Sequence, residues 1–115
     1  MGFIIDGRGV LEKITSKVNS KAVNTDWFSV NITPSRFPAV HRIYIALPSA
    51  SKVKLLMDDG SNTNIEMRLN GDATLSAVTL YAFDVVIPEG YSYNIQHLTT
   101  TQSISCWIVE ITGDN

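Results

Sequence analysis

Apolar and polar residues alternate with a period of two along most of this 115-residue chain, and this pattern constrains the fold more than any other feature. Residues 53–57 and 65–69 alternate in this way on either side of Asp59 and Gly60, a pair that tolerates positive φ. Alternate side chains of a strand lie on one face of its sheet. The pattern predicts a hairpin with one polar face, and the Ser-Asn-Thr that follows Gly60 predicts a loop longer than two residues.

The same alternation predicts further strands at residues 27–32, 40–47, 79–87, 91–97 and 103–111. In residues 79–87 the face opposite Tyr81 and Phe83 is only slightly less apolar, which leaves open whether both faces are covered. About seven strands without helix-length periodic segments predict an all-β fold, either an antiparallel β-sandwich or a small barrel. A jelly-roll-like sandwich is the preferred interpretation.

The length is typical of a single domain, and hydrophobic residues make up 44% of the chain against 17% charged, which excludes intrinsic disorder. Residues 1–26 are more polar, and their apolar positions fit a helix and a strand equally well. We therefore expect an extended N-terminal arm at 1–26, containing a short strand, and a single β-sandwich domain at 27–115. Such an arm would gain most of its order by packing on a neighbour, because its few apolar residues barely offset the backbone entropy.

Charge and hydropathy exclude several classes of function. Nine basic and eleven acidic residues give a net charge of −2, and no basic stripe suits nucleic acid. The apolar run at the N-terminus lacks the basic flank of a signal peptide, and no segment is long and apolar enough to span a membrane. Asp6 stands where N-myristoylation requires Ser or Thr. We expect a chain made in the cytoplasm that binds neither nucleic acid nor membrane.

Cysteine and histidine are too few to suggest a metal centre. Cys106 is the only cysteine, so no internal disulfide forms, and its apolar neighbours predict a strand interior. His41 and His97 are the only histidines. His97 is expected to be partly buried and hydrogen-bonded, and His41 to be solvated or at an interface. We predict no metal and no cofactor.

No constellation of residues specifies a reaction. Asp6, Asp58, Asp59 and Asp72 stand in turn sequences, where Asp caps nearby amides. Calcium at the "DDGSN" loop of residues 58–62 remains an alternative, although the helix-flanked twelve-residue pattern is absent. The chain lacks a Gly-x-Ser-x-Gly elbow and a phosphate-binding loop. We predict that it is not an enzyme and has no catalytic residues.

Asp84 interrupts an otherwise apolar face formed by Leu80, Ala82 and Val86. A buried carboxylate needs donors, so we expect a bond to a backbone amide or to Arg42 or Arg68. The alternative is that this face meets a partner subunit. The aromatic residues are expected in the core or in subunit contacts rather than in a sugar-binding platform; they include Trp27, Phe28, Tyr44, Tyr81, Tyr91, Tyr93 and Trp107.

Two stretches resemble small structural proteins of tailed bacteriophages and related viruses. The first is "IDGRGVLEKITSKVNSKAV" at residues 5–23, where Asp-Gly-x-Gly precedes a short alternating segment and a polar turn. The second is "LYAFDVVIPEGYSYNIQHLTTTQSISCWIVEITG" at residues 80–113, which is similar to the closing strands of virion β-sandwich modules.

The resemblance implies a non-enzymatic structural protein of the virion, a capsid-decoration, neck or tail component. Such proteins are commonly trimers or rings and bind other virion proteins, so we expect a homo-oligomer, most simply a trimer. The interface residues that we expect lie in the arm and where it enters the sandwich: Phe3, Ile4, Val10, Leu11, Ile14, Trp27 and Phe28. The alternative function is a carbohydrate- or receptor-binding β-sandwich module, which requires an exposed aromatic pair.

Overall fold

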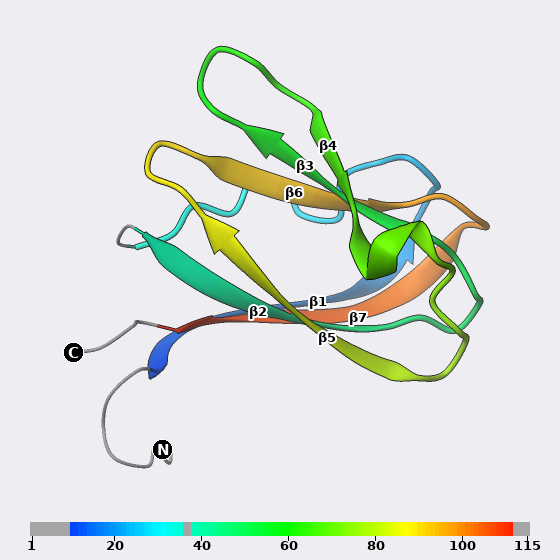
Figure 1. Cartoon of the computed structure of the whole chain (residues 1–115). Coiled ribbons are helices and arrows are strands. Elements are labelled where there is room, and N and C mark those ends of the chain that lie inside the picture. The colour runs from blue at the N-terminus through cyan, green and yellow to red at the C-terminus, as the bar shows by residue number, and fades with distance from the viewer. Residues whose placement is uncertain (1–9, 36–37, 112–115) are drawn as a thin grey trace.

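Two antiparallel sheets pack together in this chain, in a computed structural model that describes residues 10–35 and 38–111 (Figure 1). The seven strands are β1 (Val10–Lys21), β2 (Ala39–Ala46), β3 (Val53–Asp58), β4 (Ile65–Arg68), β5 (Leu80–Ile87), β6 (Ser92–His97) and β7 (Gln102–Ile111). In the described residues the only helical element is the 3₁₀ turn η1 (Leu69–Asp72). The predicted all-β fold with two packed antiparallel sheets is confirmed.

The strand order interleaves the two halves of the chain. One sheet has the order β1-β7-β2-β5 and the other has the order β4-β3-β6. The predicted hairpin is confirmed as the β3–β4 pair, and among the strands of the described residues it is the only pair that is consecutive in sequence and adjacent in a sheet. In the described residues, every other pair of neighbouring strands joins segments that are far apart in the sequence.

Residues 24–32 run along the outer edge of β6, but the strand expected at 27–32 does not form, and only Ile32 makes a β-bridge, to Tyr93. Backbone bonds hold this segment at both ends: Asn24 N–H donates to His97 O, Trp27 N–H donates to Ile95 O, and Ile32 and Tyr93 exchange two bonds. Between them the side chain of Asn94 takes the place of the backbone ladder, since its Oδ1 accepts from Phe28 N at 3.1 Å and its Nδ2 donates to Phe28 O at 2.9 Å.

The core lies between the two sheets and is filled by their alternate, inward-facing residues. Those that are fully buried or nearly so include Ile43, Ile45, Val53, Leu55, Ile87, Tyr93, Ile95, Ile104, Cys106 and Ile108. Trp27 and Phe28 belong to this core as well, with 0% and 6% of their surface exposed. The expectation that these two side chains form a subunit interface therefore needs correction, because segment 24–32 turns them inward against β6.

Part of the segment expected as an arm lies in a sheet. β1 pairs with β7 from Val10 opposite Ile111 to Lys21 opposite Gln102, with an irregular register between Val10 and Ile14. Its twelve residues form a longer strand than the short one expected. The backbone of Val10, Leu11 and Ile14 belongs to this edge strand, whereas Phe3 and Ile4 lie outside the described residues.

Candidate interaction surfaces

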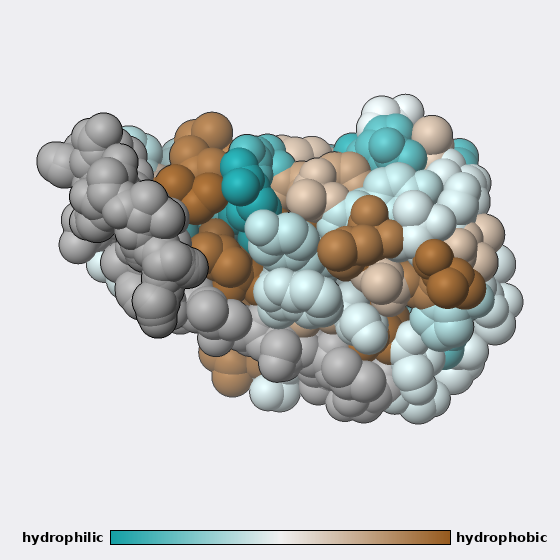
Figure 2. All heavy atoms as spheres, turned by 90° about the horizontal axis from the view of Figure 1, so that it is seen from below, coloured by the Kyte–Doolittle hydropathy of each residue, from teal (hydrophilic) through white to brown (hydrophobic). Residues whose placement is uncertain are grey.

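The four-stranded sheet has an apolar outer face, by which we mean the alternate residues of β5, β2 and β7 that point away from the core. Strand register places them in rows across the sheet: Val86–Val40–Ile111, Asp84–Arg42–Val109, Ala82–Tyr44–Trp107 and Leu80–Ala46–Ser105. Leu80 and Val86 are 57% and 61% exposed. Figure 2, which views the molecule from this side, shows several separate groups of apolar residues with polar residues between them.

An aromatic pair occupies the middle of the outer face. Tyr44 and Trp107 lie opposite each other on β2 and β7, and their rings stack with centroids 5.5 Å apart and planes 21° from parallel. Both side chains are half-buried. Large aromatic residues with a polar tip are enriched where proteins bind one another, because they supply contact area at little entropic cost.

Asp84 forms an ion pair with Arg42, which is one of the partners expected from the sequence. Arg42 donates from Nε at 2.7 Å and from a terminal nitrogen at 3.0 Å to the two carboxylate oxygens, and both side chains are about half exposed. The guanidinium holds the pKa of Asp84 below its usual value. Such an exposed pair contributes about 0.2 to 1 kcal/mol to stability. Arg42 and Asp84 are the only charged side chains on the outer face of β5, β2 and β7. Because their charges cancel, this face carries no net charge.

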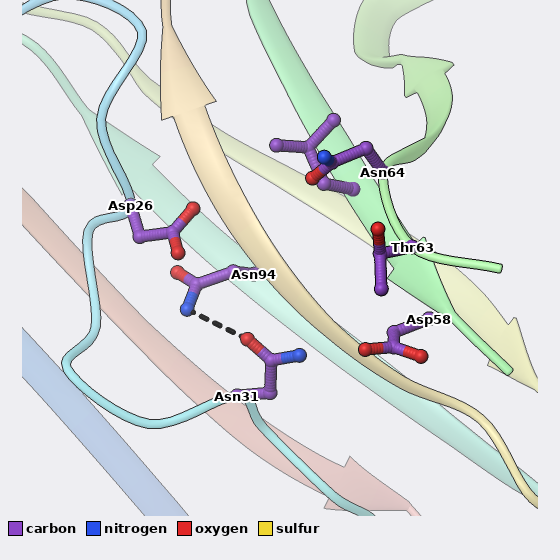
Figure 3. A pocket seen from close by; sticks show the side chains of 7 residues that line it. Asp26, Asn31, Asp58, Thr63, Asn64 and Asn94 are labelled. Atoms are coloured by element: carbon purple, nitrogen blue, oxygen red, sulfur yellow. Dashed lines mark hydrogen bonds between the residues drawn. The ribbon is translucent and has the colours of Figure 1, made fainter. Parts of the chain in front are cut away.

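A polar pocket of about 190 Å³ lies on the outer side of the three-stranded sheet. Figure 3 shows side chains that line it from segment 24–32, from β3 and β6, and from the β3–β4 loop; the full lining is Asp26, Asn31, Leu56, Asp58, Thr63, Asn64 and Asn94. Several of these groups already have partners within the chain. Asp58 accepts from Gly60 N at 2.8 Å, and Asp26 accepts from Gln96 Nε2 at 2.9 Å.

The β3–β4 loop is held by its own aspartate, as predicted from its turn sequence. Asp59 Oδ1 accepts from the backbone amides of Ser61 and Asn62 at 2.9 and 2.7 Å, and its Oδ2 accepts from the side chain of Asn62. The amide bonds from Asn62 and Ser61 hold the pKa of Asp59 below its usual value. Within residues 10–35 and 38–111, no three His, Cys, Asp or Glu side chains gather in a way that suits a metal ion.

His41 is completely buried, so the expectation of a solvated or interface histidine is wrong. Its Nε2 lies 2.8 Å from Glu110 Oε1 and its Nδ1 lies 2.6 Å from the Tyr93 hydroxyl. Glu110 also accepts from the backbone amide of Ser35 at 2.9 Å and from the Ser35 hydroxyl. Burial acts to raise the pKa of Glu110, but the hydrogen bonds from Ser35 and His41 outweigh it and lower the pKa.

This buried cluster holds the chain together rather than forming a nucleophilic triad. A serine nucleophile needs its hydroxyl next to the histidine base. Here the Ser35 hydroxyl donates to Glu110, which stands between it and His41. The carboxylate thereby ties the loop before β2 to the end of β7. Sequence reasoning missed Glu110, although its place on the same face as Ile104, Cys106 and Ile108 was a signal that it points inward.

His97 is buried and hydrogen-bonded, which confirms the interpretation of its strand position. Trp27 Nε1–H donates to His97 Nδ1 at 2.9 Å, and His97 Nε2 lies 3.0 Å from the carbonyl oxygen of Thr100. Burial lowers the pKa of His97, against a smaller opposing effect of the Thr100 bond. Cys106 is also fully buried, and burial raises the pKa of its thiol to about 12.

No protein-family model matches the sequence, and no curated protein is significantly similar to it. In the described part of the chain, no helix has the length and apolar character needed to cross a bilayer.

Proposed function

We propose that this chain is a non-enzymatic structural protein of a virus particle, a capsid-decoration, neck or tail component that binds other virion subunits and copies of itself. The outer face of the four-stranded sheet is the observation that carries the proposal. It combines exposed aliphatic residues such as Leu80 and Val86 with the Tyr44–Trp107 pair and a self-neutralised Arg42–Asp84 pair. Trp, Tyr and Arg are the residues that most often dominate binding at protein interfaces.

Strand order supports a jelly roll as the particular sandwich. With segment 24–32 counted as a strand beside β6, the two sheets have the orders β1-β7-β2-β5 and (24–32)-β6-β3-β4. Eight strands in two four-stranded sheets make up a jelly roll, an architecture that recurs in viral capsid proteins. The resemblance of residues 5–23 and 80–113 to phage structural proteins supports the virion assignment, and the residues before β1 are the proposed arm.

Particle composition and solution mass test this proposal together. Particles purified from the virus that encodes the chain should contain it in a fixed ratio to the major capsid protein. By light scattering, the isolated chain should form a discrete oligomer that Trp107→Ser weakens. Val30→Ser is the matched control, because Val30 is 75% exposed but lies in segment 24–32, away from the outer face. A chain that is absent from the particles would overturn the virion assignment.

The polar pocket favours a second candidate, a module that binds a hydroxyl-rich ligand such as a carbohydrate. Thr63 and Asn64 line it with side chains that make no hydrogen bond within the described residues, and Leu56 is its apolar member. A glycan screen should then give a ligand whose binding is lost in Asn64→Ala and kept in Asn62→Ala, since Asn62 does not line the pocket. A screen without binding would remove this candidate.

A further inference from the structure

Among the described residues, the four outer edges of the two sheets differ in how well they are protected. β4 is only four residues long and carries Glu66 and Arg68, and segment 24–32 covers β6. β1 has an irregular register near its start, and its sequence includes three lysines. Short length, charge, irregular pairing and a covering segment are the usual ways in which proteins prevent sheets from joining at their edges.

β5 carries one charged residue, Asp84, and has none of the other protections. Its eight residues pair with β2 in unbroken register, from Ala39 opposite Ile87 to Ala46 opposite Leu80. The strand contains neither proline nor lysine, and within the described residues its backbone makes no hydrogen bond except to β2. Figure 1 shows β5 in the foreground, at the free edge of the four-stranded sheet. A long, regular and apolar edge is a template for another strand.

We propose that β5 pairs antiparallel with β5 of a second copy of this chain, about a two-fold axis that runs perpendicular to the sheet. The pairing would join two four-stranded sheets into one continuous sheet and place their outer faces side by side. A second copy fits this edge because β5 is complementary to itself. Its one charged residue, Asp84, is already neutralised by Arg42 of the same chain, so the edge demands no oppositely charged partner.

The alternation of side chains restricts the register. Opposite residues must lie on the same face of the joined sheet, so the axis passes midway between one residue near the middle of β5 and the same residue of the second copy. Centring on Asp84 places two carboxylates directly opposite each other, which is destabilising. Centring on Ala82 pairs only residues 80–84. Centring on Phe83 pairs residues 80–86 and avoids the charge conflict.

In the Phe83-centred register each Leu80 lies opposite Val86 of the other copy, and each Ala82 lies opposite Asp84. Leu80 and Val86 are the large apolar residues of β5 that are exposed, and the pairing covers part of both. This inference concerns the edge of the sheet rather than its outer face, and it does not depend on the virion assignment.

Disulfide cross-linking between singly substituted chains tests both the partner and the register. Opposite residues of antiparallel strands have Cα atoms about 4.5 to 5.5 Å apart, a distance that a disulfide spans. Leu80→Cys and Val86→Cys are each substitutions at exposed positions, and Cys106 is buried and does not compete. An equal mixture of the two full-length variants should give a covalent dimer under mild oxidation, seen on a non-reducing gel.

Each variant alone should remain uncross-linked, because in this register Leu80 lies far from Leu80 of the partner, and Val86 lies far from Val86. A mixture that gives no more cross-linked dimer than the single variants would overturn the proposed pairing. Light scattering of the unmodified chain gives an independent test, since a strict monomer at all concentrations would also overturn it. The proposed virion function has its own test in particle composition, so the two proposals can fail separately.

Discussion

At the scale of single residues, the contacts of His97 determine its protonation state. The indole N–H of Trp27 can only donate, so His97 Nδ1 must keep its lone pair, and Nε2–H donates to the Thr100 carbonyl oxygen. Adding a proton to Nδ1 would point two N–H groups at each other. This geometry and the lowered pKa agree that the folded chain holds His97 neutral.

We predict that the neutral His97 makes stability depend on pH. In the unfolded chain the imidazole takes up a proton below about pH 6.5, whereas the folded chain resists it. The unfolded state then binds more protons, so the free energy of unfolding falls as the pH drops through about 6.5 toward the lowered folded pKa. Urea unfolding at a series of pH values should show this slope in the natural chain and a weaker one in His97→Asn, which keeps an acceptor for Trp27. Equal slopes would contradict the prediction.

The sequence predicted individual residues well where their position in a strand decided the outcome. Alternation placed His97 and Cys106 inside, and Arg42 was one of the partners expected for the isolated charge of Asp84. The prediction failed for His41, because the partner that allows its burial, Glu110, lies 69 residues away along the chain. Alternation could place His41 and Glu110 on the inward faces of their strands, but no local pattern shows that these two residues meet.

At the scale of elements, Asn94 decides how segment 24–32 attaches to β6. It is 2% exposed, and besides its two bonds to Phe28 it donates to Asn31 Oδ1 at 3.1 Å. We predict that Asn94→Ala leaves the buried backbone N–H and C=O of Phe28 without partners. Each unsatisfied buried group costs about 1 to 3 kcal/mol, so the free energy of unfolding should fall by about 2 to 6 kcal/mol.

Chemical denaturation would measure this loss, and hydrogen exchange would locate it at the amides of Trp27 and Ile32, which bond β6 directly. Asn31→Ala is the matched control: it removes one bond to the Asn94 amide and one longer bond to the Ser92 hydroxyl, both only partly buried, and should cost less than about 1.5 kcal/mol. Equal losses in the two variants would show that Asn94 does not anchor the segment.

The sequence predicted where most of the strands lie, but it did not predict which strands pair with one another. The alternating runs gave the strands from residue 39 onward and the β3–β4 hairpin, because short loops and period-two patterns are local signals. β1 was ambiguous, since its apolar spacing fits a helix as well as a strand and only pairing with β7, at the other end of the chain, selects the strand. Residues 27–32 were predicted as a strand, but a side chain of β6 takes the place of most of its backbone ladder.

At the scale of the whole molecule, Cys106 reports whether the sandwich opens as one unit. It lies in β7 with Lys17 of β1 on one side and Ile45 of β2 on the other. Its side chain is fully buried, and its thiol pKa of about 12 keeps the reactive thiolate scarce near neutral pH. A thiol reagent therefore reaches Cys106 only when the packing of the sheets is broken.

We predict that labelling of Cys106 follows global unfolding of the chain. Where refolding is faster than labelling, the free energy of opening obtained from the labelling rate should equal that from urea denaturation, and both should fall in parallel as urea is added. Val30→Cys supplies the control, because this 75% exposed position should label at once in the folded chain. Labelling of Cys106 that is much faster than global unfolding would mean that the sheets open locally. Detachment of β1 from β7 is one such opening, and it would make residues 10–21 part of a detachable arm rather than a fixed edge of the sandwich.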